Sequence, residues 1–472
     1  MKTGITTFVI SALFGASSVF GETPVLAWKR DFSHPEDIFD SNKILAISRD
    51  GEIAVAAEAI TGEIVSGTTT VLNFDLNITK YGTSTGRTRW QTFYDNGTTT
   101  ADFPKGISFD QAGNVVVINN SYSAISMSSA MHIAKYGKAD GNLVWSRLFD
   151  VEADPQSDIP SDLAVDQENC VVVAGNSGRS VGQDAIALRY SPSGVLLWEK
   201  RVTSQGAFMV ANSRAYAVTV DRDNAVALVG DANKVAFTPY APFVTKHRPS
   251  DGAVLLNVYV GDSNTTGALF DVVTDPQDAE IFVCGATSLL SDNLDPKNGF
   301  VARLDANTGE IIWRVLLEGT NNGFDALQFI RLGPEGHPIV AGSFSNGADS
   351  DFYVAKLSRK NGKILWKRRI PGKPGRGDTL RGLAMDRAGN PVVTGVLGES
   401  ATVNSVRTLK LSAATGATLW DTKLRPGASA VVYDLGIDRK GNVFVCGAFS
   451  RGVNALGDDQ TNAFLAKYRM NP

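Results

Sequence analysis

A unit of about 54 residues recurs along the whole chain. Its marker is a tryptophan in a short β-rich run, found at Trp28, Trp90, Trp145, Trp198, Trp313, Trp366 and Trp420, with Asn257 in that place in an eighth copy. One small sheet cannot bury both of its faces alone, so units repeated at this period stack into an open or closed array. The repeat therefore limits the possible folds more than any other feature of the chain.

Each copy carries the signals of four strands. Two β-rich runs flank an Asp-x-x-Gly-Asn turn in residues 107–117, 383–393 and 435–445, which is typical of a hairpin. A third run follows a polar loop, as in residues 351–357. A second turn then leads into the tryptophan strand, and it is built on Gly86, Gly141, Gly194, Gly252, Gly309, Gly362 or Gly416. Four antiparallel strands in each copy predict the blade of a β-propeller.

The two ends of the propeller sequence predict how the ring closes. Residues 25–32 have the sequence of a fourth strand, whereas residues 462–468 form a third strand with no fourth strand after it. Pairing these two segments would complete the last blade and remove an exposed sheet edge. We therefore expect an all-β, eight-bladed propeller in a single domain over residues 22–472. Its inner strands should begin near Ile44, Phe103, Ser161, Ala215, Leu269, Leu327, Leu380 and Val431.

The first 21 residues have the pattern of a secretory signal peptide. A single Lys2 precedes an apolar stretch, and small residues follow it up to Gly21. We expect cleavage there and a secreted protein, extracellular or periplasmic. No later run reaches the roughly 18 apolar residues that cross a bilayer, so we expect no membrane insertion. The net charge of -4 is spread without long runs of one sign, which argues against a nucleic-acid partner. We expect a monomer.

Residues 304–313 and, more loosely, 411–420 resemble the tryptophan-docking motif of the pyrroloquinoline-quinone-type propellers, which are eight-bladed. The repeat is also similar to the β-propeller repeat of bacterial secreted and surface proteins. The resemblance implies the features of the quinone-dependent enzymes: a bound calcium, a catalytic aspartate, ring-stacking tryptophans and often adjacent cysteines. The three cysteines here are far apart, and all seven tryptophans belong to the repeat. We therefore expect no cofactor.

Apart from the repeat, the sequence contains no motif that predicts catalysis or metal binding. Cys170, Cys284 and Cys446 are expected to be buried thiols, without a disulfide or a metal. The four histidines, His34, His132, His247 and His337, are isolated and lack the spacing of a zinc site. We assign no catalytic, cofactor-binding or metal-binding residue. Paired carboxylates from different blades remain open as a polysaccharide-cleaving site.

A basic residue recurs near the end of every third strand, at Lys80, Lys135, Arg189, Lys246, Arg303, Lys356, Lys410 and Lys467. Aspartates end most inner strands, at Asp110, Asp166, Asp221, Asp275, Asp386 and Asp438. First and third strands run in the same direction, so these groups should meet at one end of each sheet. We interpret them as repeated structural pairs worth about 0 to 1 kcal/mol where solvent reaches them. The alternative is a cation ring that binds an anionic polymer.

The turns and loops divide the disc into two faces. Both tight turns of every copy lie on one face, which we call the turn face, and the remaining connections lie on the loop face. The long loops there span residues 59–70, 121–130, 231–240, 286–298 and 449–461. Variable loops on a rigid scaffold are the usual place for recognition. Asp292 with Asp295, and Asp458 with Asp459, are candidates for calcium or, alternatively, for turn capping.

These patterns favour a secreted, non-enzymatic propeller that binds a protein or polysaccharide ligand on its loop face, as a binding or scaffold module. The alternative is an enzyme whose active site is assembled across blades. It would be a quinone-dependent dehydrogenase or a polysaccharide-cleaving enzyme.

Overall fold

The computed structural model describes residues 24–32, 40–66, 69–95, 100–123, 128–150, 157–179, 182–202, 212–233, 239–262, 264–275, 279–289, 298–319, 323–453 and 459–470. The predicted signal peptide, residues 1–21, lies outside these residues, and so does His34. Thirty-two strands form eight separate four-stranded sheets. None of the described segments forms a helix of the length and apolarity that spanning a bilayer requires.

Each sheet is one blade, numbered here in chain order. Blade 1 holds β2 (Asp40–Ile47), β3 (Glu52–Ser66), β4 (Thr69–Gly82) and β5 (Thr88–Tyr94); blade 2 holds β6 (Thr100–Phe109), β7 (Val115–Ser123), β8 (Ser128–Tyr136) and β9 (Leu143–Phe149). Blade 3 holds β10 (Ile159–Val165), β11 (Val171–Gly178), β12 (Gln183–Tyr190) and β13 (Leu196–Val202); blade 4 holds β14 (Ser213–Val220), β15 (Val226–Asn233), β16 (Tyr240–His247) and β17 (Val254–Tyr259).

Blade 5 holds β18 (Thr265–Asp275), β19 (Glu280–Leu289), β20 (Asn298–Asp305) and β21 (Ile311–Leu317); blade 6 holds β22 (Asp325–Leu332), β23 (Pro338–Ser345), β24 (Ser350–Leu357) and β25 (Ile364–Ile370). Blade 7 holds β26 (Thr379–Met385), β27 (Pro391–Gly398), β28 (Asn404–Leu411) and β29 (Thr418–Leu424). Blade 8 holds β30 (Ser429–Ile437), β31 (Val443–Val453), β32 (Asp459–Met470) and, as its outer strand, β1 (Pro24–Phe32).

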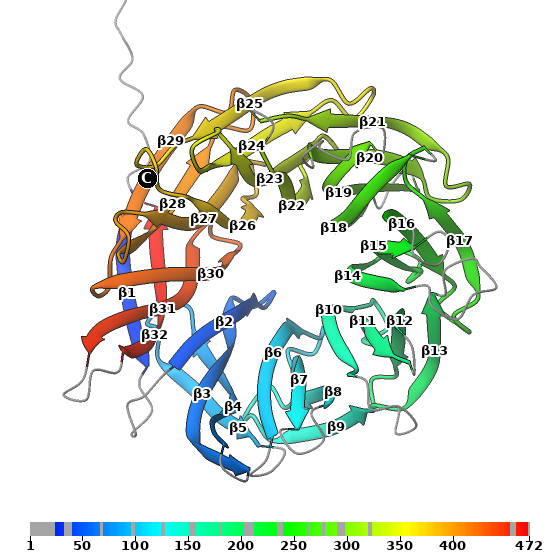
Figure 1. Cartoon of the computed structure of the whole chain (residues 1–472). Coiled ribbons are helices and arrows are strands. Elements are labelled where there is room, and N and C mark those ends of the chain that lie inside the picture. The colour runs from blue at the N-terminus through cyan, green and yellow to red at the C-terminus, as the bar shows by residue number, and fades with distance from the viewer. Residues whose placement is uncertain are drawn as a thin grey trace, which may run out of the picture.

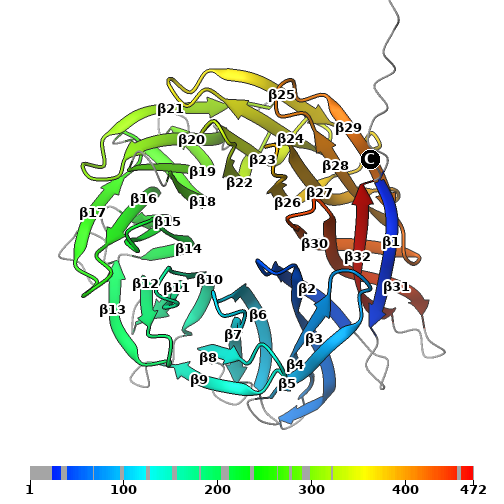
Figure 2. The ribbon, with the colours of Figure 1, turned by 180° about the vertical axis from the view of Figure 1, so that it is seen from behind.

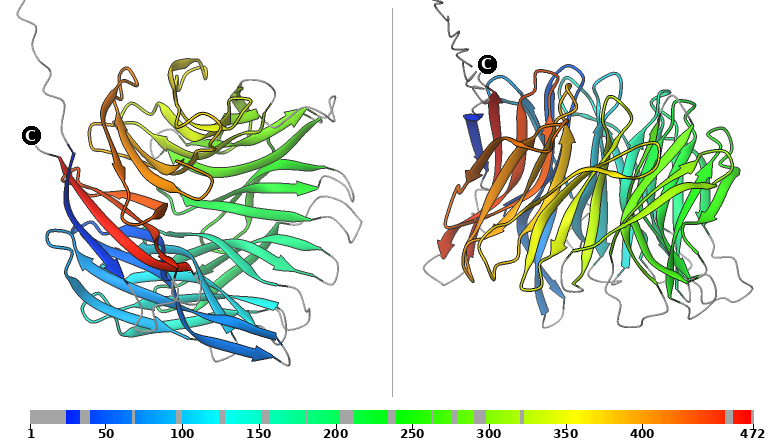
Figure 3. Two further views of the ribbon diagram at one scale, coloured as in Figure 1. Left: turned by 60° about the vertical axis from the view of Figure 1, so that its left-hand side comes forward. Right: turned by 90° about the horizontal axis from the view of Figure 1, so that it is seen from above.

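The blades stand around a ring whose inner wall is made by the first strand of each blade (Figure 1). Seen from the side, the strands of every blade run between the two faces of the disc (Figure 3). The eight predicted inner strands and the eight-bladed architecture are confirmed.

The predicted closure is also confirmed. Strand β1 pairs antiparallel with β32, from Pro24 opposite Met470 to Phe32 opposite Ala463. Viewed from behind, the blue first strand lies beside the red last strand (Figure 2). The pairing gives β32 a partner on its outer side and completes the fourth strand of blade 8.

The core lies between blades, because each blade is covered on both faces by its neighbours. The middle strands are therefore apolar on both sides, as in the run Val115 to Ile118 of β7, where every side chain is fully buried. The outer strands are mostly exposed, except at the tryptophan position. In β9 the side chains of Leu143 and Val144 are 55% exposed, whereas Trp145 is 6% exposed. Burying such a large side chain stabilises the fold by about 1.5–3 kcal/mol.

Six of the seven tryptophans dock on the next blade. The Trp145 indole N–H donates to the Pro192 carbonyl at 2.9 Å, in the turn between the third and fourth strands of blade 3. Gly194 of that turn has φ +80°, and a Cβ there would lie 2.6 Å from the Trp145 ring. Only glycine fits both the backbone conformation and the close approach. The same contact recurs between the other tryptophans and turn glycines, in the pairs Trp28–Gly86, Trp90–Gly141, Trp198–Gly252, Trp313–Gly362 and Trp366–Gly416.

The assignment of Asn257 to the tryptophan place is wrong by one residue. In blade 4 the residue opposite Lys246 is Leu256, and in the other blades the residue opposite the equivalent basic side chain is the tryptophan. Leu256 is 6% exposed, and a Cβ on Gly309 would lie 2.5 Å from its Cδ1. Asn257 points the other way and is exposed, because neighbouring side chains of a strand alternate between faces.

Trp420 differs from the other tryptophans. Its indole N–H is buried and meets no hydrogen-bond acceptor among the described residues. Six other tryptophans donate to a carbonyl in the turn between the third and fourth strands of the next blade, at Thr83, Lys138, Pro192, Pro249, Arg359 and Ala413. In blade 8 the third strand is β32 and the fourth is β1, so no turn connects them.

Candidate functional site: the central channel

A cavity of about 540 Å³ opens where the inner strands of blades 1 to 5 reach the turn face. We call it the mouth cavity. Its wall includes the side chains of Arg49, Ser108, Gln111, Gln167, Thr219 and Arg222. The volume lies within the range of sites for small molecules, about 300–1,000 Å³. Sequence reasoning placed only short turns on this face, so the cavity was missed.

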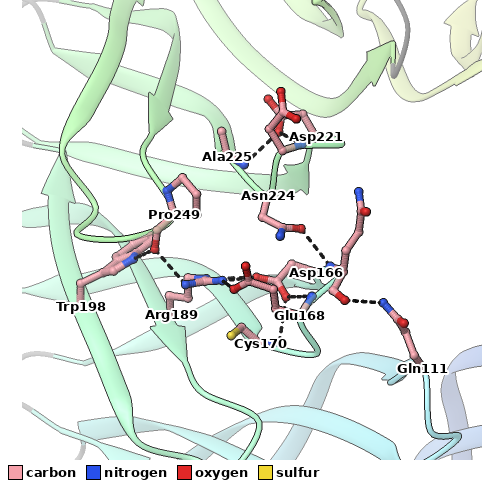
Figure 4. A network of polar contacts seen from close by, with 12 residues as sticks. Gln111, Asp166, Glu168, Cys170, Arg189, Trp198, Asp221, Asn224, Ala225 and Pro249 are labelled. Carbon is pink, nitrogen blue, oxygen red and sulfur yellow. Dashed lines mark hydrogen bonds and ion pairs between the residues drawn. The ribbon is translucent and has the colours of Figure 1, made fainter.

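Hydrogen bonds between blades hold the rim of the mouth cavity in place (Figure 4). The Gln111 backbone N–H donates to Asn169 Oδ1 at 2.7 Å, and its amide donates to the Gln167 carbonyl at 2.7 Å. Gln167 repeats the pattern with Asn224 Oδ1 and the Arg222 carbonyl, at 2.9 and 2.7 Å. The turns of blades 2, 3 and 4 are therefore linked in series.

This linkage explains two unusual turn residues. Asn169 and Asn224 have φ of 61° and 63°, a conformation that the equivalent turns of blades 2, 7 and 8 reach with Gly113, Gly389 and Gly441. Asparagine tolerates the left-handed region better than most side chains. Here each Oδ1 accepts a hydrogen bond from the preceding blade, which gives asparagine a role that glycine cannot take. The rim is thus cross-linked over blades 2 to 4 without a ligand.

The aspartates in the cavity wall are neutralised from behind by the repeated basic residues. Asp166 accepts from Arg189 at 2.6 Å, and Glu168 accepts from the same guanidinium at 2.8 Å (Figure 4). Arg189 also donates to the Pro249 carbonyl that receives the Trp198 indole. Lys135 Nζ lies 3.2 Å from Asp110, and both side chains are only 3% exposed. The carboxylates of the cavity wall therefore stabilise the blades through these ion pairs.

The predicted structural pairs are confirmed for Asp110–Lys135, Asp166–Arg189, Asp221–Lys246 and Asp386–Lys410. Elsewhere the partners differ. Lys80 pairs with Glu52, Arg303 with Glu280 and Lys356 with Glu335, whereas Asp275 pairs with Arg359 of the next blade. Lys467 donates to the Thr83 carbonyl.

Solvent reaches these pairs only slightly, so the value expected for exposed pairs does not apply to them. The basic side chains are buried or nearly so, because they lie beside the docked tryptophans. A buried pair that loses one partner is destabilised far more than an exposed one. Burial also rules out these eight residues as an exposed ring for an anionic polymer.

Every inner strand contains a β-bulge, which places one extra residue opposite its partner strand. These bulge residues are Lys43, Lys105, Ser161, Tyr216, Phe270, Gln328, Arg381 and Tyr433. Bulges commonly re-aim a side chain next to a functional site. In blades 3 to 8 a glycine pairs next to the bulge. A Cβ on Gly230, for example, would lie 1.7 Å from the Arg214 carbonyl oxygen.

Three bulges are followed by an aspartate that links two adjacent inner strands by a hydrogen bond. Asp162, Asp271 and Asp434 each accept the backbone N–H of the next blade, from Val218, Ile330 and Leu45, all at 2.9 Å. Burial raises the pKa of Asp162 to about 7 and that of Asp434 to about 6. Both carboxyls therefore gain protons near neutral pH.

Arg331 of β22 is the one cation that reaches this group of aspartates among the described residues. Its Nη1 lies 2.6 Å from Asp271, and its charge also acts on Asp162 and Asp434. These residues come from blades 3, 5, 6 and 8, so the interaction crosses the channel. Sequence reasoning missed the group, although an aspartate four residues before the turn aspartate in three copies was its visible signal.

Further cavities open on the loop face among the described residues. One of about 520 Å³ lies between blades 6 and 7 beside Gln328 and Asp349. Another, of about 560 Å³, lies between blades 7 and 8 beside Tyr433 and Phe449. Residues 59–70, expected to form an irregular loop, instead extend the β3–β4 hairpin to the pair Ser66 and Thr69.

Parts of the other loops predicted to carry recognition lie outside the described residues. This holds for residues 124–127, 234–238, 290–297 and 454–458. Asp292, Asp295 and Asp458 therefore fall outside the description, and Asp459 lies on β32. Their binding of calcium stays a prediction.

The candidate nucleophiles and metal ligands in the described part of the chain are the three cysteines and two groups of acidic side chains. Cys170, Cys284 and Cys446 are free and buried, and burial raises the pKa of Cys170 to about 11. Asp166, Glu168 and Cys170 come close enough together for a metal, but Arg189 occupies the carboxylates. Asp75, Asp95 and Asp102 form a second carboxylate group between blades 1 and 2.

The histidines on third strands are packed side chains. His132 is fully buried, stacks on Tyr94 at 3.7 Å between ring centroids, and bonds Ser146 at 2.8 Å. Burial lowers its pKa to about 3. Its neutral ring therefore belongs to the contact between blades 1 and 2. His247 is buried in the same way and contacts the Gly252 carbonyl.

Comparison with known proteins supports the fold. A family model described as outer membrane protein assembly factor BamB matches residues 244–432. Two quinohemoprotein alcohol dehydrogenases superpose on nearly the whole chain. The chain is an eight-bladed β-propeller, and its middle part resembles this family model. No curated protein matches this propeller in sequence.

Two of the similar structures are named as enzymes, and a third is not. The enzyme from Comamonas testosteroni has a TM-score of 0.54 and 13% identity, with 95% of the propeller and 78% of the enzyme covered. The enzyme from Pseudomonas putida HK5 has a TM-score of 0.56 and 14% identity, with 95% and 76% covered. Sqt1 from Chaetomium thermophilum has a TM-score of 0.53 and 12% identity, with 90% and 95% covered. At these identities the likeness concerns the fold.

The side chains of the propeller do not fit a quinone cofactor. The tryptophans stand on outer strands, and six of them donate their indole N–H to the next blade, which leaves none of the seven to stack on a quinone in the channel. The cysteines are separate and buried. The tryptophans and adjacent cysteines that the resemblance implies beside such a cofactor are therefore not in the channel wall.

Proposed function

We propose that the protein is a secreted, monomeric, non-catalytic binding propeller that takes its ligand at the central channel. The observation that carries the proposal is the mouth cavity, whose rim is fixed by the Gln111 and Gln167 hydrogen bonds between blades. A site fixed in advance loses less entropy when the ligand binds. The three cysteines, His132 and His247 are buried between the blades, which supports binding over catalysis.

This proposal moves the ligand from the loop face to the channel. The cavity wall supplies guanidinium, amide and hydroxyl groups from Arg49, Gln111 and Thr219, and these groups suit a polar ligand such as a polysaccharide end or a polar protein segment. The loop-face cavities beside Gln328 and Tyr433 border bulge residues of the same inner strands. A ligand that enters the channel would meet both ends of these strands.

A substitution that fills the mouth cavity tests the proposal. Thr219→Trp places a large ring in the cavity wall, whereas Thr88→Trp adds the same ring on the exposed strand β5 as a matched control. The purified protein is screened on glycan and peptide arrays, and each hit is measured with both variants. Loss of binding in Thr219→Trp alone supports the channel site, and equal binding by both variants rejects it.

The same protein is also mixed with pyrroloquinoline quinone and calcium, and its absorbance and dye-linked alcohol oxidation are recorded. Spectral capture of the quinone together with turnover would overturn the non-catalytic proposal. It would establish the quinone-dependent dehydrogenase in its place.

A further inference from the structure

Exposed cations of the inner strands and their first turns are concentrated on one side of the channel. The cations come from four consecutive blades, 7, 8, 1 and 2, and they are the bulge residues Arg381, Lys43 and Lys105 with the turn residues Arg387, Arg439 and Arg49. We call these six residues the cationic arc. Blades 3 and 5 on the other side contribute Asp162 and Asp271. Two charged residues depart from this division: Asp434 of blade 8, which accepts the Leu45 N–H, and Arg222 of blade 4, which lines the mouth cavity. Clefts lined by one sign of charge attract ions of the opposite sign.

The bulge cations of the arc are accessible from the channel. Lys105 and Arg381 are exposed although they lie within inner strands. Neighbouring blades cover both faces of each blade, so solvent reaches an inner strand along the channel. Lys43 is half-buried, lies 4.4 Å from the Tyr433 ring centroid and pairs with Glu58 at 3.2 Å.

The turn cations of the arc stand at the channel's end on the turn face. Arg49 lines the mouth cavity, and Arg387 and Arg439 occupy the equivalent turn position in blades 7 and 8. All three are exposed. Within the described part of the chain, Lys43 is the one member of the arc with a carboxylate within 4 Å. The other five cations are available to an anion.

The remaining wall offers apolar rings and hydroxyl groups. Tyr216 and Phe270 are adjacent bulge residues and meet edge to face, with ring centroids 5.6 Å apart. Tyr433 lies within the arc itself. At the mouth, Ser108 and Thr219 add hydroxyl groups. Aromatic rings combined with a few fixed polar groups are typical of small-molecule sites.

We propose that the channel binds an acidic oligosaccharide, with its carboxylates on the cationic arc and its sugar rings against the aromatic bulge residues. The assignment rests on the proposed function of the channel as a binding site. A chain of sugars offers both the regularly spaced carboxylates and the dense hydroxyl groups that this wall complements. The arc runs along the inner strands from the bulges to the turns, so it suits an extended ligand.

The inner strands suit a sugar chain better than an acidic peptide. An extended peptide binds a sheet by adding a strand along a regular edge. Each inner strand is interrupted by its bulge, as at Lys105 of β6 and Arg381 of β26. A bulge leaves a residue unpaired and bends the strand, so the edge that faces the channel is not continuous.

Isothermal titration of the full chain with three probes of equal length tests the inference: an oligogalacturonate, a neutral oligogalactose and an oligoglutamate. We expect the oligogalacturonate to bind with an affinity that falls as salt is raised. In the variant Arg49→Glu with Arg387→Glu, the affinity should fall about tenfold or more, because hydrogen bonds to charged groups are lost. Lys367→Glu with Arg368→Glu, two exposed residues of the outer strand β25, is the matched control and should leave the affinity unchanged.

Each other outcome overturns the inference. Equal binding of the neutral sugar, or no effect of the Arg49 and Arg387 charge reversal, removes the anionic assignment. If Thr219→Trp still blocks binding in that case, the channel remains a binding site. Tighter binding of oligoglutamate removes the sugar assignment. Failure of all three probes, while the array hits still depend on the mouth cavity, rejects the acidic oligosaccharide and retains the proposed function.

Discussion

The buried ion pairs between third strands and first turns make a quantitative prediction. Lys135→Met removes the charge that lies 3.2 Å from Asp110, in a place where both side chains are 3% exposed. The ammonium also donates to the Pro192 carbonyl at 3.1 Å, so the contact to blade 3 is lost too. Removing one partner of a buried pair costs about 3–5 kcal/mol.

The lower end of that range is expected here. Asp110 keeps two hydrogen bonds after the substitution, from the backbone N–H and the side-chain amide of Asn114, each at 2.9 Å. Methionine also retains the apolar length of the lysine stem. We therefore expect a loss of about 3 kcal/mol in the free energy of unfolding.

Urea denaturation followed by tryptophan fluorescence and circular dichroism measures the loss. Lys138→Met is the control, since its ammonium pairs with Asp50 at 2.8 Å at an exposed site and should leave stability unchanged. Adding Asp110→Asn to Lys135→Met should restore most of the loss, because the uncompensated charge disappears. If Lys135→Met is no less stable than Lys138→Met, the buried pairs do not hold the blades as we infer.

Three further measurements test the docking of a tryptophan, the buried Asp162 and the closure of the ring. Gly141→Ala should destabilise the fold by about 1–3 kcal/mol more than Gly441→Ala in urea denaturation. Both turns have positive φ, but only at Gly141 would the new Cβ meet an indole, that of Trp90, at 2.6 Å. Equal losses would contradict the docking of the tryptophan on the turn. Burial raises the folded pKa of Asp162 to about 7, so its contribution to stability is present below the unfolded pKa near 4 and is lost as pH rises toward 7. Asp162→Asn should flatten that dependence in denaturation curves taken between pH 4 and 8, and an unchanged slope would show that another group is responsible. Deleting β1 should expose the edge of β32 and cause aggregation or earlier melting, whereas a monomeric variant of normal melting temperature would contradict the closure.

The blade repeat was predictable because packing imposes it on every copy. Trp145 must dock on the next blade and Gly194 must lie against it, so both residues leave a periodic mark in the sequence. Leu256 was missed because an aliphatic residue in that place looks like its neighbours in the strand. Only the register opposite Lys246 identifies it.

The candidate site was less predictable, because it is made by residues of different blades. Arg331 and Asp162 are far apart in the sequence and interact only once the ring has closed. The bulge residues were invisible for another reason: the extra residue at Lys105 or Tyr216 interrupts the alternation that defines a strand in sequence. The mouth cavity follows from hydrogen bonds between turns, which no single turn sequence contains.

The pairing of β1 with β32 has a consequence for chain connectivity. Pro24 and Met470 lie opposite each other in one sheet, so a short linker between them would join the two strands without moving any blade. New ends could then be opened at another exposed turn, and the same ring would form from a circularly permuted chain. Such a linker would also run through the place where a carbonyl could receive the Trp420 indole. The ring thus has no intrinsic first blade, and the position of the chain break is one choice among eight.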